Sequence, residues 1–253
     1  MPEQTRTDQT VVAQPCPWNF PMESAERRKL GLLDRSSLLS DLTAQECRAI
    51  VSSGREHTYE RRQIIHFEGD PIRHVVMLTS GCAKTIQVGQ NGTEVILRLA
   101  GPGEVVGTVG FDGRTRHCSM AQTLRTSTAL VWEATAFEQL SQRIPALRRN
   151  TMQILGKQLE EMQERFREIS TEKVASRLSR QLMRLLDQVG RQLDDAIEVS
   201  LSREELAQLI GTTLFTVSRL LSDWDERGIV ATRREAVSVK DVRALAKLSE
   251  CEE

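Results

Sequence analysis

The stretch MQILGKQLEEMQERFREI (residues 152–169) decides how this chain is organised. Its apolar residues recur at alternating spacings of three and four, and glutamine, glutamate, lysine and arginine fill most positions between them. The apolar seam consists of Met152, Leu155, Leu159, Met162, Phe166 and Ile169. A narrow apolar seam on a charged helix is typical of two identical helices that bury it against each other, so we predict a dimer helix. The alternative is a surface helix packed on its own domain, because the pattern lasts little more than two heptads.

Length and composition limit the class of protein. A chain of 253 residues suits two medium-sized domains. With 39% hydrophobic and 27% charged residues and a net charge of -1, it is expected to be globular, and any nucleic-acid surface must be local. The five cysteines are scattered without a C-x-x-C pair, which favours reduced thiols over a disulfide framework or a zinc site. No apolar run approaches the roughly 20 residues of a membrane span, so we expect a cytoplasmic protein without membrane contact.

Before the seam, the sequence predicts a flexible arm over residues 1–34 and then a domain of short strands. Thr43-x-x-Glu46 is a capping box that starts a helix, and Gly54 ends it. β-type runs follow at residues 63–67, 74–78, 83–88, 94–99 and 128–132, separated by turn signals that include Ser80-Gly81 and Asn91-Gly92. Asn-Gly predicts a hairpin in which both turn residues have positive φ. Strands at this spacing indicate a β-roll or jelly-roll sandwich over residues 35–142.

After the predicted dimer helix, assigned to residues 143–170, the pattern indicates a winged helix-turn-helix domain over residues 171–253. Ser170-Thr171 interrupts the heptads as a plausible hinge, and an amphipathic helix follows from Val174 to Gly190. Ser202 and Glu205 form a second capping box, whose helix stops at Gly211. A further helix opens at Thr212 or Thr213 and carries Val217, Leu220, Leu221 and Trp224 on its core face. The fold class is therefore α+β.

The other face of that last helix carries Phe215, Ser218, Arg219 and Ser222 at spacings that form one stripe. In a DNA major groove Arg219 can pair with guanine, and Phe215 can contact a thymine methyl. The alternative is that Phe215 packs within the protein and Arg219 is merely solvated. Residues 229–231 and 236–239 predict a small hairpin wing with Arg233 and Arg234 at its tip, where they could contact phosphates. The predicted DNA-binding residues are Ser202, Arg203, Thr212, Thr213, Leu214, Phe215, Thr216, Ser218, Arg219, Ser222, Arg233 and Arg234.

This order of parts resembles the Crp/Fnr family, the cyclic-AMP receptor and fumarate-nitrate regulators of bacterial transcription. The resemblance covers residues 38–249 and is most specific over residues 211–221, which are similar to the recognition helix of the fumarate-nitrate branch. It implies a homodimer that reads an inverted repeat, a signal in a cyclic-nucleotide-binding-like β-roll, and RNA polymerase as a further partner. Ser218 and Arg219 match two of that branch's reading residues, whereas Phe215 replaces its glutamate. The branch's TTGA-type half-site is therefore not expected.

The sensor end departs from the family pattern. Thr108 stands where the cyclic-AMP receptors have a glutamate, and Cys118 stands where they have the phosphate-binding arginine, so cyclic AMP is not expected. The predicted effector pocket contains Gly107, Thr108, Arg116, His117, Cys118, Ser119, Met162 and Gln163. An iron-sulfur cluster is not expected either, because the arm offers only Cys16. The effector stays unidentified.

Three alternatives remain beside a signal-controlled regulator. The first is a regulator that binds DNA without any ligand. The second is a β-roll module that acts through a protein partner, although it leaves Arg219 unexplained. The third is a metal-dependent β-roll enzyme, for which His66-Phe67-Glu68 is the nearest approach to a ligand motif. We expect a regulator with neither catalytic residues nor a metal site.

Overall fold

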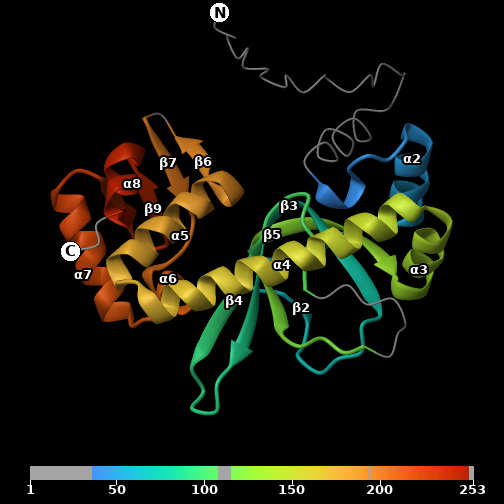
Figure 1. Ribbon diagram of the computed structural model, residues 1–253, viewed down its shortest axis with the longest axis horizontal. Helices are drawn as coiled ribbons and strands as arrows, with labels where there is room; N and C mark the ends of the chain where they lie inside the picture. The colour runs from blue at the N-terminus through green and yellow to red at the C-terminus, as the bar shows by residue number, and fades with distance from the viewer. Residues whose placement is uncertain (1–35, 108–114, 194, 251–253) are drawn as a thin grey trace, which may run out of the picture.

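The computed structural model describes residues 36–107, 115–193 and 195–250 (Figure 1). A sheet domain and a C-terminal mixed domain are joined by one long helix, α4 (Pro145–Thr171), which crosses the molecule between them. The arm predicted over 1–34 lies outside the described residues. Within the described ranges, no helix has both the length and the apolar composition needed to cross a membrane.

The N-terminal domain is built on a five-stranded antiparallel sheet. Its strands are β1 (Arg55–Tyr59), β2 (Ile64–His66), β3 (His74–Val88), β4 (Glu94–Ala100) and β5 (Met120–Glu133). The order is β1-β5-β3-β4, and β2 pairs with β5. The 3-10 helix η1 (Ser37–Leu39), α2 (Ala44–Ser53) and α3 (Ala134–Arg143) share a buried core with the sheet and with the start of α4. This arrangement confirms the predicted α+β class.

The prediction of a turn at Ser80-Gly81 is wrong, because β3 runs through both residues. Gly81 has a φ of +92°, and a Cβ there would lie 2.1 Å from the Oγ of Ser127 on β5. The pairing of β3 with β5 shifts register on both sides of this glycine. Gly81 therefore marks an irregularity inside one long strand, where only glycine fits against the neighbouring strand.

Two further details of the sheet differ from the sequence pattern. The strand β1 was not predicted, and β5 begins at Met120 rather than at residue 128, because both segments are rich in polar residues. Asn91-Gly92 does join β3 to β4, but of these two residues only Gly92 has a positive φ. The side chain of Asn91 instead accepts a hydrogen bond from the Thr93 amide at 3.1 Å. The prediction of a hairpin is confirmed, and the prediction of its turn type is wrong.

Within the described residues, the C-terminal domain combines four helices with a small antiparallel sheet and begins with α5 (Val174–Val189). Its further elements are β6 (Arg191–Leu193), β7 (Ala196–Val199), α6 (Arg203–Ile210), α7 (Leu214–Glu226), β8 (Val230–Arg233), β9 (Ala236–Val239) and α8 (Val242–Glu250). The strand order is β6-β7-β9-β8. Leu178, Leu182 and Leu185 of α5 are fully buried, which confirms the predicted amphipathic helix.

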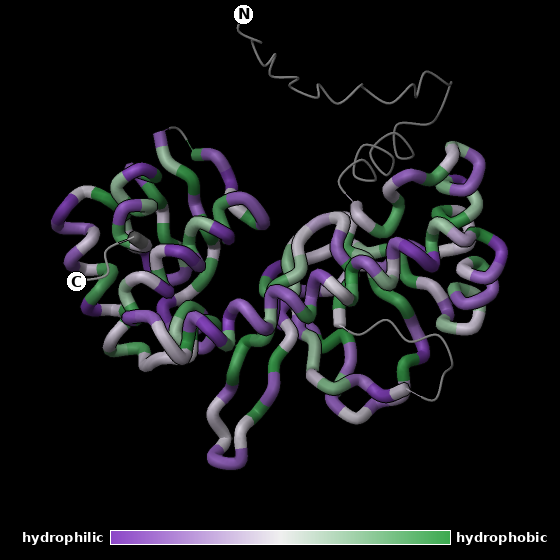
Figure 2. Tube along the Cα trace, viewed as in Figure 1, coloured by the Kyte–Doolittle hydropathy of each residue, from purple (hydrophilic) through white to green (hydrophobic). Residues whose placement is uncertain are grey.

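The two domains also touch directly. The core of the C-terminal domain is continuous with Cys82 of β3 and with Ile96 and Leu99 of β4. The β3–β4 hairpin carries alternating hydrophobic and hydrophilic residues along its length and ends in a hydrophilic tip (Figure 2). Helix α6 packs against β4. The C-terminal domain is therefore held against the β-roll as well as by the helical connection.

Candidate nucleic-acid interface

Local sequence signals fix the geometry of the α6–turn–α7 segment. The Oγ of Ser202 accepts a hydrogen bond from the Glu205 amide, and the Glu205 carboxylate accepts one from the Ser202 amide, which confirms the predicted capping box. Gly211 ends α6 in the left-handed conformation, at a φ of +67°. The Oγ1 of Thr213 then accepts from the Thr216 amide at 3.2 Å and caps α7. Helix, glycine turn and helix follow as predicted.

The two faces of α7 differ sharply in exposure. Val217, Leu221 and Trp224 are at most 1% exposed, so the core face is confirmed. On the opposite face Phe215 is 76% exposed and Leu214 is 50% exposed. A phenyl ring on the protein surface lacks the free energy that burial in a core would give, so its exposure favours contact with a partner.

Polar residues surround these two apolar side chains on the same surface. Arg219 and Ser222 are exposed, whereas Thr216 and Ser218 are partly buried. Among the described residues, Arg219 has no carboxylate partner. The Phe215 ring therefore does not pack inside the described part of the chain, and the Arg219 guanidinium is available to a polyanion.

The remaining predicted residues frame this surface unequally. The hydroxyl groups of Ser202 and Thr213 are already used in helix caps. Arg203 donates to Thr232 Oγ1 at 2.9 Å, and Asp225 accepts from the same threonine at 3.0 Å. These contacts hold Arg203 against β8, a placement that sequence reasoning did not foresee.

The wing formed by β8 and β9 confirms the predicted hairpin, but its tip lies against the β-roll. Glu235 accepts from Arg61 at 2.8 Å and lies 3.9 Å from Arg62, both in the loop after β1. Arg61 and Arg62 hold the pKa of the Glu235 carboxyl below its usual value. Arg233 lies 3.9 Å from Glu198 on β7. The wing is therefore anchored to the N-terminal domain in this conformation.

The helix α4 divides its surface between its own domain and solvent. Leu147, Asn150, Thr151 and Ile154 are at most 8% exposed, and the Asn150 amide donates to Ser40 O at 2.7 Å. The predicted seam lies on another face: Leu155 is half-buried, and the other members are 46% to 74% exposed, namely Met152, Leu159, Met162, Phe166 and Ile169. Packing on its own domain thus leaves an apolar seam uncovered.

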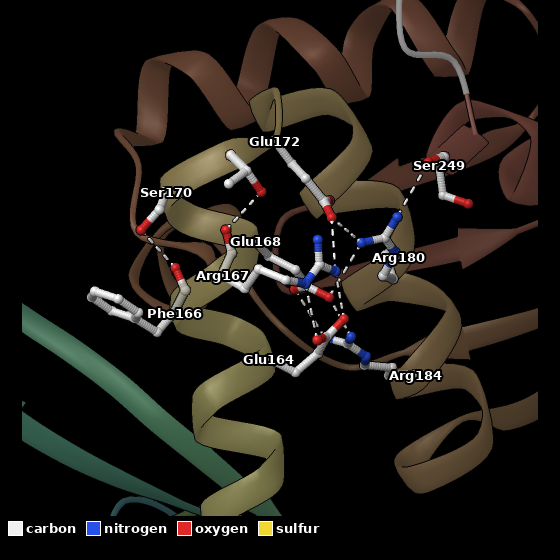
Figure 3. Close-up of polar contacts among 10 residues, drawn as sticks. Glu164, Phe166, Arg167, Glu168, Ser170, Glu172, Arg180, Arg184 and Ser249 are labelled. Atoms are coloured by element: carbon white, nitrogen blue, oxygen red, sulfur yellow. Dashed lines mark hydrogen bonds and ion pairs between the residues drawn. The ribbon is translucent and has the colours of Figure 1, made fainter.

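The end of α4 is tied to α5 by a cluster of ion pairs (Figure 3). The carboxylate of Glu168, whose side chain is 5% exposed, accepts from both terminal nitrogens of Arg184 and lies 3.4 Å from Arg180. Arg180 also donates to Glu172 at 2.5 Å, and this bond raises the pKa of the guanidinium. α4 runs to Thr171, and Lys173 stands at the N-cap position of α5 without a side-chain cap, so Ser170-Thr171 does not act as a helix start. Their hydroxyls instead donate to backbone carbonyls one turn earlier, those of Phe166 and Arg167.

The residues of the predicted effector pocket lie in different surroundings. His117 and Ser119 are buried, whereas Cys118 is exposed. Arg116 is exposed and donates to Gly69 O at 2.6 Å. Thr108 lies outside the described residues. Met162 and Gln163 are exposed on α4, whereas the cavity that His117 lines takes its other walls from the β-roll alone.

That cavity measures about 620 Å³ and is lined by all four histidines of the chain, His57, His66, His74 and His117. The rings of His66 and His117 stack at 3.5 Å, 9° from parallel. Burial, with a smaller contribution from His117, lowers the pKa of His66 to about 4, and burial also lowers the pKa of His117. Both imidazoles are therefore neutral near pH 7. Within the described ranges, His, Cys, Asp and Glu residues form no cluster able to hold a metal ion.

Two family sequence profiles match this chain. One, described as a cyclic nucleotide-binding domain, covers residues 56–144. The other, described as a Crp-like helix-turn-helix domain, covers residues 176–248. The two matches correspond to the β-roll with α3 and to the C-terminal domain.

Curated relatives agree with these profiles. The chain is 27% identical over 199 residues to the anaerobic regulatory protein of Pasteurella multocida, which covers 77% of this chain and 72% of the relative. It is 26% identical to the transcriptional activator protein anr of Pseudomonas aeruginosa, over 79% of this chain and 82% of the relative. It is 23% identical to a CRP-like cAMP-activated global transcriptional regulator of Mycobacterium tuberculosis, over 85% of this chain and 97% of the relative.

Solved structures show the same fold. FixK2 from Bradyrhizobium japonicum matches 79% of this chain and 99% of its own with a TM-score of 0.69 at 17% identity. A transcriptional regulator of the CRP/FNR family from Thermus thermophilus matches 79% of this chain and 100% of its own with a TM-score of 0.68 at 18% identity. With its cyclic nucleotide-binding domain, its Crp-like helix-turn-helix and these relatives, the chain belongs to the Crp/Fnr family of DNA-binding transcription regulators.

Proposed function

We propose that this regulator works as a homodimer formed along α4 and reads an inverted repeat with α7, one half-site per subunit. The observation that carries the proposal is the outward face of α7, where Phe215 is 76% exposed beside an exposed Arg219. A guanidinium can pair with the O6 and N7 atoms of guanine, and a phenyl ring can contact the thymine methyl. The other predicted contact residues of α7 flank this face, and Arg233 and Arg234 would contact phosphates once the wing leaves Arg61 and Arg62.

The uncovered seam of α4 supports the homodimer. Phe166 is 74% exposed and Met152 is 60% exposed, although the start of the same helix is buried against its own domain. Burying the seams of two copies against each other would contribute about 25 cal/mol per Å² of apolar surface, and this free energy would offset the cost of association. Two α7 helices would then enter successive major grooves about 34 Å apart.

Three finer points belong to the same proposal. The β-roll receives a signal other than cyclic AMP, because Cys118 stands where a phosphate-binding arginine is expected. The signal is passed through the α4–α5 connection, where Glu168 and Glu172 bind Arg180. RNA polymerase is the further partner, and the protein acts in the cytoplasm. A dimer that binds DNA without any signal is the second candidate, favoured by the half-buried His66 and the buried His117, whose rings lie near Gly107.

Selection from a random duplex pool tests the proposal. The purified protein, without added ligand, is expected to enrich an inverted repeat with half-sites about one helical turn apart. Arg227→Ala is the matched control for the Arg219→Ala variant, because this exposed arginine lies at the far end of α7 and pairs with Asp223 at 3.2 Å. Enrichment of an asymmetric single site would contradict the dimeric arrangement. The absence of enrichment both with and without cell extract would contradict the assignment of α7 as the reader.

A further inference from the structure

A cavity of about 700 Å³ lies between the β-roll and the C-terminal domain, on the side of the wing. The β-roll contributes four cationic side chains to its walls, those of Arg61, Arg62, Lys84 and Arg125. The C-terminal domain contributes three more, those of Arg191, Arg233 and Arg234. It is separate from the outward face of α7, because no residue of that helix lines it.

The carboxylates in this cavity do not balance its cations. The three acidic residues in the walls are Glu198, Glu205 and Glu235. Glu235 binds Arg61 and Arg62, Glu198 lies 3.9 Å from Arg233, and Glu205 lies 3.7 Å from Lys84. Among the described residues, the guanidinium groups of Arg125, Arg191 and Arg234 have no carboxylate partner. The cavity therefore holds uncompensated positive charge from both domains.

The start of α6 borders this cavity, with the Glu205 carboxylate bound to the Ser202 amide. Ser202, which caps the helix, lines the cavity together with Ser200. The partial positive charge of this helix end is offset by Glu204 and Glu205 in the first turn, so the cations of the cavity rather than the helix dipole carry the positive field. Lys84, whose side chain is 10% exposed, lies beside the first turn through its contact with Glu205. A charge held in such a partly buried place interacts more strongly with an anion than a fully solvated one does.

We propose that this interdomain cavity binds an oligophosphate group, carried by a nucleoside di- or triphosphate. Arginine forks at several positions suit an anion with several oxygens at once, whereas a single carboxylate would satisfy only one of them. The cavity volume lies within the range of sites for small organic ligands. Leu124, Val189 and Leu201 give the same cavity an apolar wall against which a nucleoside can rest.

Such a ligand would oppose DNA binding, a consequence that rests on the proposed function. It would bridge Arg125 of the β-roll to Arg191 and Arg234 and so hold the wing where Glu235 already anchors it. The wing arginines could not then reach phosphates of DNA at the same time. By linkage, the binding of a DNA site must weaken the binding of the ligand by the same factor by which the ligand weakens DNA binding.

Titration calorimetry of the full-length protein at low ionic strength tests the site directly. The probes are ATP and inorganic triphosphate, which separate a nucleotide site from a site for phosphate alone. The double variant Arg125→Gln/Arg191→Gln is expected to weaken binding by roughly tenfold or more, since it removes two charge-assisted contacts. Arg148→Gln, an exposed arginine on α4 outside the cavity, is the matched control and is expected to bind as the wild type does.

The outcomes separate this inference from the proposed function. Saturable binding of ATP that is stronger than that of triphosphate, and that the double variant loses with an unchanged thermal transition, supports it. Triphosphate binding equal to that of ATP overturns the nucleoside part and leaves an inorganic oligophosphate as the ligand. No saturation up to millimolar probe, or equal binding by wild type and a folded double variant, overturns the site. Binding of ATP by a protein that fails to select any duplex would refute only the proposed DNA reader.

Discussion

Phe215 on α7 keeps 76% of its surface exposed, whereas His117 in the β-roll keeps 6%. The first belongs to an open face beside Arg219. The second is stacked on His66, whose ring in turn lies against Gly107, where an added Cβ would come within 2.5 Å of the His66 Cε1 atom. The outward face of α7 is thus open, whereas the His66 and His117 rings lie against Gly107 in the wall of the histidine-lined cavity. Under the proposed function, the predicted DNA-reading surface is therefore exposed, whereas two members of the predicted effector pocket, His117 and Ser119, are buried.

The largest effect is expected from the seam of α4 that we propose as the dimer interface. Phe166→Asp should abolish the dimer at micromolar concentration, because each subunit loses about 1.5–3 kcal/mol of apolar burial and gains a charge in the seam. Sedimentation velocity measures the change, and DNA affinity should fall with it. Phe166→Leu is the control and should remain dimeric. A monomeric wild type, or a dimeric Phe166→Asp protein, would refute the seam as the interface.

Stability below neutral pH tests the stacked pair of His66 and His117. Burial lowers the pKa of His66 from its ordinary 6.5 to about 4. The unfolded chain therefore binds more protons than the folded one between these values, so the free energy of unfolding should fall as pH falls through this window, by about 3 kcal/mol at most.

Denaturant titrations across this pH range measure the effect. His66→Phe keeps an aromatic ring on His117 and should flatten the pH dependence, whereas exposed His57→Gln should leave it unchanged. An identical slope in wild type and His66→Phe would show that the stacked pair does not carry the effect.

At the open end, Arg219→Ala should weaken specific DNA binding by about 1–3 kcal/mol and relax one base position in each half-site. Fluorescence anisotropy with the selected duplex measures the loss, and Arg227→Ala should bind normally. Affinity unchanged by Arg219→Ala would remove this side chain from the interface.

The smallest effect is expected at the connection between the two ends. Glu168→Gln should lower the free energy of unfolding by about 1–2 kcal/mol, because Arg180 and Arg184 are partly exposed and can turn to water. Glu160→Gln, at an exposed position on the same helix, is the matched control for thermal denaturation. Equal transition temperatures for both variants would mean that the ion pairs do not hold α4 to α5.

Local signals predicted the parts of this fold whose causes are local. The capping boxes at Thr43 and Ser202 and the stop at Gly211 lie within a few residues of what they determine, and the structure contains all three. The continuity of β3 through Gly81 depends on Ser127 of another strand, so a turn was the natural but wrong prediction. Pattern alone cannot supply such distant neighbours.

The same distinction holds for the candidate site. The helical period was enough to place Phe215 and Arg219 on the exposed face of α7. The docking of Glu235 on Arg61 joins residues 174 positions apart, and no local pattern announces it. The effector pocket was the hardest to predict, because its proposed members come from distant segments and Thr108 lies outside the described residues. Those assignments stay predictions.

The central claim is that α7 of each subunit reads one half of a symmetric site, and Phe215→Glu tests it most directly. This change places a carboxylate where the resemblance to the fumarate-nitrate branch expects one, on a position 76% exposed, so the fold should tolerate it. Duplex selection with both proteins should show a changed base preference at one position, repeated symmetrically in the two half-sites. An unchanged sequence preference, or a change in only one half of the site, would contradict the account.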